Sequence, residues 1–335
     1  MPKNQREEER CAQSGTTVRD RLATSCRLGS LPDQEPGPGE VRVRVRYSGV
    51  NPGDTKKRRG WLGSSMPYPR VIPHSDAAGV VDAVGEGVTR DRVGRRVWVY
   101  GAQSTDPFGT AAQYTVVPEQ LAVDLPDDVP DDVGACLGIP GITAHRAVFG
   151  DGPVAGATVL VHGVLGGGRR PGRPACPLGR GHRHWHGRSS NDPIEVDTPA
   201  VDYVVPLDRP DPAADIRAVA PDGVDRIIEV AFSGNVDLDA AVGKIGTVIA
   251  AYASRQDRPT FPFWPMLFNN MTIRLLGSDD FPSEAKEQAA TDLTAAARDG
   301  ALSITIGETL PLERVAEAHD LVDAGTRHRV VVALS

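Results

Sequence analysis

The feature that most constrains the fold is an apolar strand that runs directly into glycines, in the sequence TVLVHGVLGGG at residues 158–168. Glycines in this place let backbone N–H groups approach the pyrophosphate of a dinucleotide at the start of a helix. Gly163, Gly166 and Gly167 carry this pattern. Glycines also mark plain turns, so the motif alone leaves a simple β-turn open. Its position at the head of a series of apolar runs favours a dinucleotide loop.

Short apolar runs recur after this loop at a spacing that suits a parallel sheet with crossover helices. Such runs are typical of strands buried on both faces, and they lie at residues 158–163, 202–205, 225–230, 246–252 and 271–277. Helical patterns at 212–220 and 238–245 lie between them. We therefore expect a doubly wound α/β domain of the Rossmann type over residues 126–278.

A helical stretch leads into this domain, and further elements follow it. The stretch begins at Asp131, is broken at Pro140 and resumes over residues 143–149, because proline interrupts a helix. Two amphipathic helices and a closing strand follow residue 278, at 284–300, 312–325 and 328–334.

The first third of the chain is rich in short strands. Val41–Tyr47 alternates as a half-buried strand does, and further β-rich segments punctuated by Gly and Pro continue to residue 125. We expect a compact antiparallel β-barrel domain made of residues 31–125 together with the returning segment 279–335. Residues 1–30 are polar and carry no clear pattern, so we expect a poorly patterned N-terminal tail.

The sequence after the glycine loop lacks the pattern of the helix that normally follows such a loop. The window 168–188 contains Pro174 and Pro177 and several glycines. Interior prolines cost about 3 kcal/mol each and glycines about 1 kcal/mol each, whereas a whole domain is stable by only about 5–15 kcal/mol. We predict that no phosphate-capping helix forms in this aberrant window.

Composition and charge narrow the class of partner. The 40% hydrophobic and 24% charged residues are those of an ordinary globular protein, and 335 residues suit two domains. A net charge of −7 gives no electrostatic reason to bind nucleic acid or an anionic membrane. The four cysteines are scattered, no long apolar run occurs and the start is charged. We expect a cytoplasmic protein that binds small molecules.

Together these segments resemble the zinc-free quinone oxidoreductases, the NADPH:quinone reductase branch of the medium-chain dehydrogenase/reductase superfamily. The resemblance is carried by PGPGEVRVRVRYSGVNPGD, PRVIPHSDAAGVVDAVGEGV, GRRVWVYG, GTAAQYTVVP, GIPGITAHRAV, TVLVHG with its glycines, GVDRIIEV, PLERVAEAHDLVDAG and VVVAL. It implies a GroES-like β-barrel catalytic domain and a Rossmann-type domain that binds NADPH. It also implies a homodimer formed through residues 271–277.

The resemblance also bears on metals. Zinc-dependent relatives have metal-binding cysteine or histidine at the positions that are Asn51, Ser75 and Ile139 here. Ile139 offers no ligand atom, and the cysteine-rich lobe of structural zinc is missing, so we expect neither zinc. His74 lies next to a lost position and has no accompanying ligands in the sequence.

The same comparison shows where the chain departs from its relatives. The family loop reads Gly-x-x-Gly-Gly-Val-Gly, and this chain departs from it at Gly168 and Arg169. The length of the window is preserved while its pattern is lost. Our hypothesis is an out-of-frame translation over 168–188, because Gly, Arg, Pro and Ala codons of GC-rich DNA interconvert on a one-base shift. Residues 1–28 are a second candidate, since the first strand of the family is not recognisable there.

Several polar side chains are candidates for contacts with cofactor or substrate, and Asn51 and the segment 188–190 match such positions in the family. Asn51 is expected to contact the nicotinamide ribose or the substrate, although Asn-Pro is also a turn signal. Thr143 could bind the nicotinamide amide or serve as a helix N-cap. Tyr252 follows an apolar run at the nicotinamide end of the sheet, with packing as the alternative. The 2′-phosphate of NADPH is expected to contact three residues: Arg188, Ser189 and Ser190.

Two groups of basic residues are not assigned a role. HRHWHGR alternates its histidines as on one face of a strand, but carboxylates and cysteines are lacking around it, so we expect no metal there. The arginines of this window are expected to form a basic loop. His319 lies among apolar positions of a helix and is expected to be a packed histidine.

The resemblance implies hydride transfer from NADPH to a quinone or another conjugated carbonyl, without zinc. Asn51 is the candidate hydrogen-bond donor to the acceptor oxygen. An enoyl-thioester reductase on the same fold is one alternative. The other is a non-catalytic homologue with impaired dinucleotide binding, which the aberrant window favours.

Overall fold

The structure is a computed structural model that describes residues 12–16, 26–60, 68, 70–104, 106–163, 183–187, 202–302, 304–326 and 328–334, with the backbone alone for 12–16 and 183–187. The chain divides into two compact units. Unit 1 consists of residues 1–140, 293–298 and 304–335, and unit 2 of residues 141–292 and 299–303. The first two changes of unit, after residues 140 and 292, lie later in the chain than the expected boundaries at 125/126 and 278/279, and residues 299–303 return briefly to unit 2.

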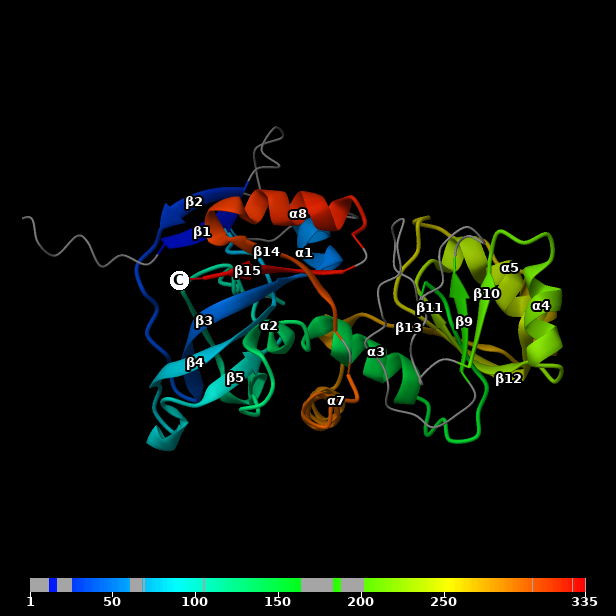
Figure 1. Cartoon of the computed structure of the whole chain (residues 1–335), viewed down its shortest axis with the longest axis horizontal. Coiled ribbons are helices and arrows are strands. Elements are labelled where there is room, and N and C mark those ends of the chain that lie inside the picture. Colours follow the sequence, from blue (N-terminus) through cyan, green and yellow to red (C-terminus); the bar gives the residue numbers. More distant parts are fainter. Residues whose placement is uncertain are drawn as a thin grey trace, which may run out of the picture. The chain divides into compact units, whose positions relative to one another are not determined.

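Unit 1 is built on one mainly antiparallel sheet (Figure 1). Along the sheet the strands are β14 (Ile306–Pro311), β15 (Arg329–Ala333), β3 (Glu40–Val50), β4 (Asp76–Val84), β5 (Arg96–Val99) and β7 (Ala122–Asp124), and β6 (Tyr114–Pro118) also pairs with β3. The expected antiparallel pattern holds for every pair except β14 and β15, which run parallel. The expected closing strand is β15, which lies beside β3.

β3 is the centre of this sheet. Its residues 40–44 pair with β6, its residues 47–50 pair with β15, and its other edge pairs with β4. The alternation expected for this segment is present, since Val41, Val43 and Val45 are buried in the core of the unit. A strand that alternates in this way is held in register because a slip by one residue would turn the valines outward.

Short helices complete unit 1. They are α1 (Pro52–Arg58), α2 (Asp131–Gly134) and α8 (Val315–Asp323), and α8 packs on β14 and β15. The expected tail contains structure, because β1 (Ala12–Thr16) and β2 (Cys26–Ser30) form an antiparallel pair. The expectation of an unpatterned segment over 1–30 is therefore wrong for these residues. Their pairing depends on backbone hydrogen bonds, which leave little trace in side-chain periodicity.

α2 explains why unit 1 extends past residue 125. The carboxylate of Asp131 accepts hydrogen bonds from Arg46 and Arg96, at 2.8 and 2.7 Å. Further along, the N–H of Ile139 donates to the carboxylate of Asp76 on β4. These bonds hold residues 131–139 against the sheet, although their sequence pattern is that of a helix leading into the next domain.

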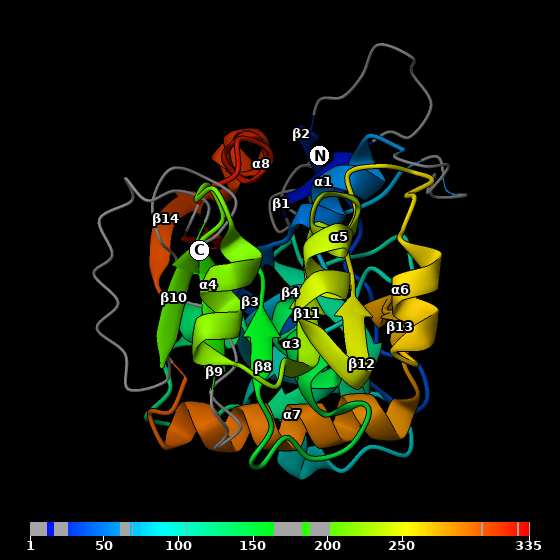
Figure 2. The ribbon, with the colours of Figure 1, turned by 90° about the vertical axis from the view of Figure 1, so that its right-hand side faces the viewer.

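Unit 2 contains a six-stranded, fully parallel sheet (Figure 2). In order along the sheet the strands are β10 (Tyr203–Pro206), β9 (Arg183–Gly187), β8 (Val159–Val161), β11 (Val224–Glu229), β12 (Gly243–Ala251) and β13 (Thr272–Leu275). All five apolar runs identified in the sequence form strands. β9 lies inside the aberrant window, so the expectation of a loop there is wrong for residues 183–187.

Helices connect and cover these strands. They are α3 (Ile139–Phe149), α4 (Pro212–Val219), α5 (Phe232–Val242), α6 (Phe263–Phe268) and α7 (Ser283–Arg298). In Figure 2, α4 and α5 lie over the sheet, where Ile216 and Val236 enter the core. Figure 1 shows α7, which begins in unit 2 and ends in unit 1.

Two helix boundaries differ from the expected ones. Pro140 does not break α3, because it is the second residue of the helix, in the turn whose N–H groups have no partner within the helix. α5 ends at Val242 and not at Ile245, since Gly243 stops the helix and starts β12.

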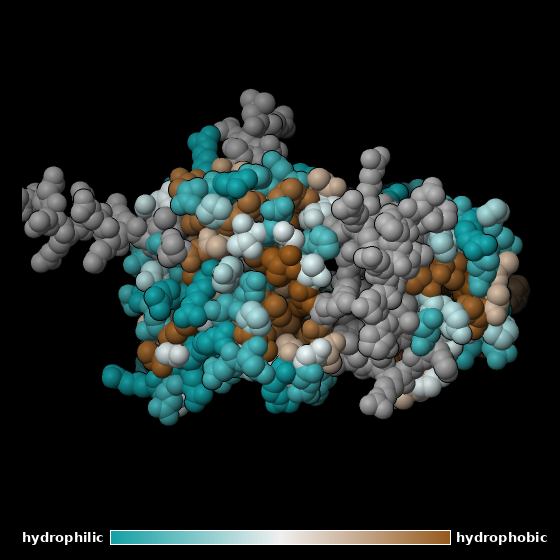
Figure 3. Space-filling view, in the orientation of Figure 1, coloured by the Kyte–Doolittle hydropathy of each residue, from teal (hydrophilic) through white to brown (hydrophobic). Residues whose placement is uncertain are grey.

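Each unit has its own apolar core. In unit 2 the largest cluster includes Leu160, Ile227 and Ile249, one from each of three adjacent strands. On the face drawn in Figure 3, hydrophilic and hydrophobic residues alternate over the surface, as on an ordinary globular protein. In the described part of the chain, no helix is both long enough and apolar enough to cross a bilayer.

Candidate functional site

The carboxyl ends of the unit 2 strands meet at one edge of the sheet, where the candidate cofactor site lies. β8 is the first of these strands in the chain, and β9 and β11 flank it on opposite sides. The strand order therefore reverses beside β8. In sheets of this order, dinucleotides bind outside the carboxyl ends of the strands at the point of reversal.

Gly163 makes the turn that leaves this edge. Its φ of 67° lies in the left-handed region, and a Cβ atom there would lie 2.6 Å from Cγ2 of Val230. Glycine is therefore required at this position. The other predicted loop glycines, Gly166 and Gly167, lie outside the described residues. So do the predicted phosphate contacts Arg188, Ser189 and Ser190.

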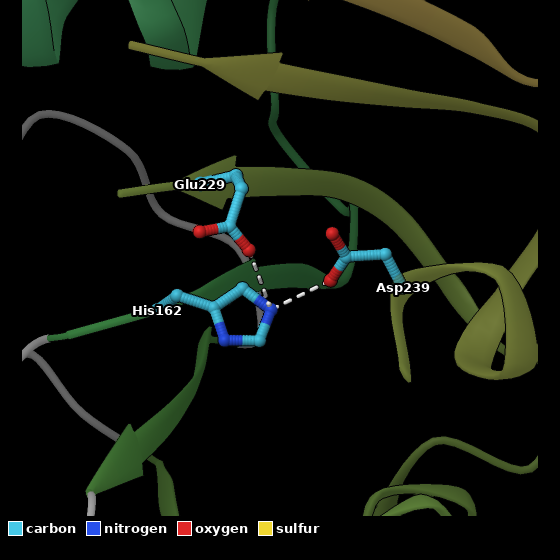
Figure 4. Close-up of side chains that lie close together, drawn as sticks. All are labelled: His162, Glu229 and Asp239. Carbon is cyan, nitrogen blue, oxygen red and sulfur yellow. Dashed lines mark hydrogen bonds and ion pairs between the residues drawn. The ribbon is translucent and has the colours of Figure 1, made fainter. Parts of the chain in front are cut away.

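Three buried polar side chains converge at the same edge (Figure 4). His162 follows β8, Glu229 ends β11 and Asp239 lies on α5. Nε2 of His162 lies 2.7 Å from Oδ1 of Asp239 and 3.4 Å from Oε2 of Glu229. All three side chains are shielded from solvent. The ligand atoms lie within 4.8 Å of one another, which is close enough to share one cation.

These groups change one another's affinity for protons. Burial lowers the pKa of His162, but its hydrogen bond to Asp239 and the two negative charges outweigh burial and raise that pKa above its ordinary value. Burial raises the pKa of Glu229, which His162 opposes and Asp239 reinforces. The group thus carries two carboxylates against a single imidazole.

The predicted residues Tyr252 and Thr143 lie in unit 2 as well. Tyr252 follows β12 at the carboxyl edge, and its N–H donates to the carbonyl oxygen of Glu229. The residue is 37% exposed. Thr143 is the fifth residue of α3 and is nearly buried. The alternative that Thr143 is an N-cap is therefore wrong, because the helix starts four residues earlier.

Asn51 lies in unit 1, directly before α1, and its amide is fixed from both sides. Nδ2 donates to Oδ2 of Asp76 at 2.7 Å, and Oδ1 accepts from Nη2 of Arg329 at 2.6 Å. The backbone N–H of Asn51 donates to Asp54. Because an amide has two N–H donors, one hydrogen of Nδ2 remains beyond its bond to Asp76.

The positions of the lost zinc ligands come together around Asp76. Asn51 and the N–H of Ile139 both bond to its carboxylate, and Ser75 precedes it. Ile139 has no ligand atom, and the amide of Asn51 is already held by its two neighbours. These residues do not fit the zinc of the zinc-dependent relatives.

His74 does have partners. Its Nδ1 lies 2.8 Å from Oγ of Ser48, and its Nε2 lies 2.8 Å from Nε2 of His319. Both histidines are fully buried in unit 1. His319 is thus packed, as expected, but it also pairs with His74, which sequence analysis left without companions. His74 has a φ of 76°, a left-handed backbone that is uncommon for histidine.

Comparison with known proteins identifies the family. The alcohol dehydrogenase GroES-like domain matches residues 37–127, and the zinc-binding dehydrogenase domain matches residues 200–329. Human quinone oxidoreductase is 30% identical over 302 residues, which cover 86% of each chain. The chain belongs to the quinone oxidoreductases. The rat protein of this family is also 30% identical, over 291 residues and 84% of each chain.

Solved structures of this family share the fold. A mycobacterial protein complexed with NADPH superposes with a TM-score of 0.79 at 23% identity, covering 97% of this chain and all of its own. A putative NADPH:quinone reductase from Bacillus thuringiensis has a TM-score of 0.82 at 15% identity, with 97% and 99% coverage. The predicted quinone oxidoreductase fold, a GroES-like domain and a Rossmann-type domain, is confirmed, and the chain is an oxidoreductase by family.

The group of His162, Glu229 and Asp239 was not predicted from the sequence. Charged residues within runs that are predicted to be buried on both faces carry a signal, because a buried charge needs a partner. Glu229 in DRIIEV and His162 in VLVHG both satisfied that criterion. Asp239 lies on a helix, outside these apolar runs, so the same criterion does not identify it.

Proposed function

We propose that this quinone oxidoreductase is an NADPH-dependent, zinc-independent reductase that transfers a hydride to a quinone or another conjugated carbonyl. The observation that carries this proposal is the reversal of strand order beside β8, with the Gly163 turn at the reversal point. A cytoplasmic location, expected from the scattered cysteines, is part of the proposal.

When bound, the cofactor supplies the hydride. Gly163 would let the chain approach the pyrophosphate, together with Gly166 and Gly167. Thr143 and Tyr252 would hold the nicotinamide end. We assign the 2′-phosphate, which distinguishes NADPH from NADH, to the segment Arg188–Ser190, because Arg and Ser suit a phosphate anion.

Asn51 is the proposed donor to the acceptor oxygen. Its remaining Nδ2 hydrogen can stabilise the negative charge that develops there, and Arg329 and Asp76 keep the amide from rotating. The final proton would come from solvent. With no zinc ligands at these positions, this hydrogen bond takes the place of a Lewis acid.

Cofactor binding is tested by titrating NADPH and NADH against the purified chain and a Gly163→Val variant. We expect the variant to bind NADPH at least about 10-fold more weakly, because the left-handed turn that follows β8 is lost. Gly156→Val is the matched control, since Gly156 also has a left-handed φ, of 75°, but no atom near its Cβ position. Absence of NADPH binding at millimolar concentration would favour the non-catalytic alternative.

The acceptor is tested by steady-state assays with a quinone and an enoyl thioester. We expect turnover of the quinone, and a lower kcat in Asn51→Ala with little change in the Kd for NADPH. Turnover of the enoyl thioester alone would establish the alternative reductase.

We also propose a homodimer through β13. This strand lies at the edge of the sheet with Leu275 77% exposed, and Phe268 of α6 is 72% exposed nearby in the chain. An apolar edge strand is a template for pairing with a second copy. Light scattering should give a dimer mass for the natural chain and a monomer mass for Leu275→Lys. A monomer in both would contradict the proposal.

A further inference from the structure

The group formed by His162, Glu229 and Asp239 offers more ligand atoms than one proton can satisfy. The ring nitrogen Nε2 faces two carboxylates (Figure 4), but a single N–H can point well at only one of them. Asp239 is at hydrogen-bond distance, 2.7 Å, whereas Glu229 at 3.4 Å lies beyond it. Oδ2 of Asp239 is buried and has no hydrogen-bond partner among the residues that the structure describes. A buried carboxylate oxygen without a partner is costly.

The negative charges of this group also exceed its positive charge. Two carboxylates face one imidazole, and within the described ranges neither carboxylate forms an ion pair with lysine or arginine. With both carboxylates ionised and the imidazole charged, one negative charge is left without compensation in a fully buried place, unless Glu229 holds a proton. A divalent cation with a neutral imidazole and both carboxylates ionised would bring the sum to zero.

We infer that His162, Glu229 and Asp239 bind one divalent cation of the zinc class through Nε2 and one oxygen of each carboxylate. Zinc bonds of about 2.0–2.2 Å hold ligand atoms about 3–3.5 Å apart in a tetrahedral site. The observed distances of 2.7 and 3.4 Å lie close to that range. An imidazole ligand favours zinc, copper, iron or nickel over magnesium, calcium or manganese.

The surroundings support Glu229 as a ligand. Its second oxygen, Oε1, accepts a hydrogen bond from the N–H of Ala231, and Nδ2 of Asn235 donates to both carboxylate oxygens, at 3.1 Å to Oε1 and 3.0 Å to Oε2. Hydrogen bonds of this kind orient a ligating carboxylate. The inferred site lies in unit 2, whereas Asn51, Ser75 and Ile139 lie in unit 1. The inference does not rest on the proposed reductase activity.

The test is a zinc titration of the full chain after dialysis against a chelator, followed by competition with a chromogenic chelator. We expect one zinc per chain at micromolar concentration or below, and a loss of affinity of about 100-fold or more in Asp239→Asn. Glu229→Gln, with the same expected loss, serves if Asp239→Asn does not fold. Asp292→Asn is the matched control, because Asp292 also bonds a histidine, His145 at 2.8 Å, but without a second carboxylate.

Two further measurements separate this site from others. His182, His184 and His186 could bind zinc adventitiously, so a variant with all three changed to Gln must keep the tight site. X-ray absorption should show a nitrogen and oxygen shell without sulfur. No saturable zinc uptake, uptake unchanged in Asp239→Asn and Glu229→Gln, loss in the triple-histidine variant, or equal binding of magnesium would overturn the inference.

Discussion

Asp54 is a carboxyl group whose burial ties the stability of unit 1 to pH. Burial and the nearby charge of Asp76 raise its pKa to about 7, from an ordinary 3.8. Between these values the folded chain holds a proton that the unfolded chain has released. Stability is therefore greatest below the unfolded pKa and is lost as pH rises through 7.

We predict that Asp54→Asn removes this dependence. Compared with the variant, the natural chain should lose up to about 1.4 kcal/mol per pH unit between pH 4 and 7. Above pH 7 the difference should become constant. Urea unfolding at a series of pH values measures it, and parallel curves for the two proteins would contradict the prediction.

The His74–His319 pair acts in the opposite direction. Burial, and then the charge of Arg58, lower the pKa of His319 to about 3, and burial lowers that of His74 well below its ordinary value. In acid, His74 and His319 become protonated in the unfolded chain but stay neutral in the folded chain. Stability is therefore present above the unfolded pKa of 6.5 and is lost as pH falls toward 3.

We predict that His319→Gln makes unit 1 less sensitive to acid. Glutamine can keep a hydrogen bond to His74 but cannot take up a proton. The slope of unfolding free energy against pH below 6.5 should decrease by up to about 1.4 kcal/mol per unit. Acid unfolding followed by circular dichroism checks this, and a midpoint that does not move downward would count against it.

Some residues of the candidate site could be predicted from local sequence patterns, and others could not. The glycine pattern predicted Gly163, because a left-handed turn after a strand has few alternatives. The bonds around Asn51 depend on Arg329, 278 positions away, and no local pattern reports such a contact. The convergence of Glu229 and Asp239 on His162 likewise depends on the sheet order.

Among the elements, the start of α3 depends most on a single contact. Asp76 of β4 accepts the Ile139 N–H, and Gly138 lies against the same carboxylate. A Cβ at Gly138 would lie 2.1 Å from Oδ1 of Asp76.

We predict that Gly138→Ala destabilises the protein by about 1–3 kcal/mol, the usual cost of overpacking. Gly53→Ala is the control, because no atom lies within 4 Å of its Cβ position. Chemical unfolding compares them. Equal midpoints for the two variants would show that Asp76 can move aside.

Elements with strong periodicity were predicted well. The five apolar runs of unit 2 form strands, and burial is most complete in the central strand β11, whereas the edge strands β10 and β13 keep exposed residues. β9 could not be predicted, since its sequence RHWHG lacks an apolar run and the strand exists by pairing with β8 and β10. The N-terminal pair β1 and β2 is similar. The helix break predicted at Pro140 was wrong because a proline in a first turn and one in a helix interior look alike in the sequence.

For the whole molecule, the two units have separate cores, with Val43 fully buried in one and Leu160 in the other. Their number was predictable from length and from the change of pattern along the chain. The boundaries of the units were not predictable, because tertiary contacts decide to which unit residues 131–139 and the end of α7 belong.

We predict two calorimetric transitions. Val43→Ala should lower the melting temperature of one, and Leu160→Ala that of the other, each through a loss of about 2–4 kcal/mol in core packing. Differential scanning calorimetry of the three proteins checks this. One transition that moves as a whole in both variants would mean that the units unfold together.

The pairing of β15 with β3 has a consequence for synthesis on the ribosome. Most of unit 2 has been translated once Asp292 is added. The central strand of unit 1, β3, can complete its pairing only after β15 (residues 329–333) has been made. The amino-terminal unit is therefore completed last, some seconds after its partner at ordinary translation rates. A chain that ends after residue 303 and is released from the ribosome should hold a protease-resistant unit 2 and an unfinished β3 that chaperones can recognise.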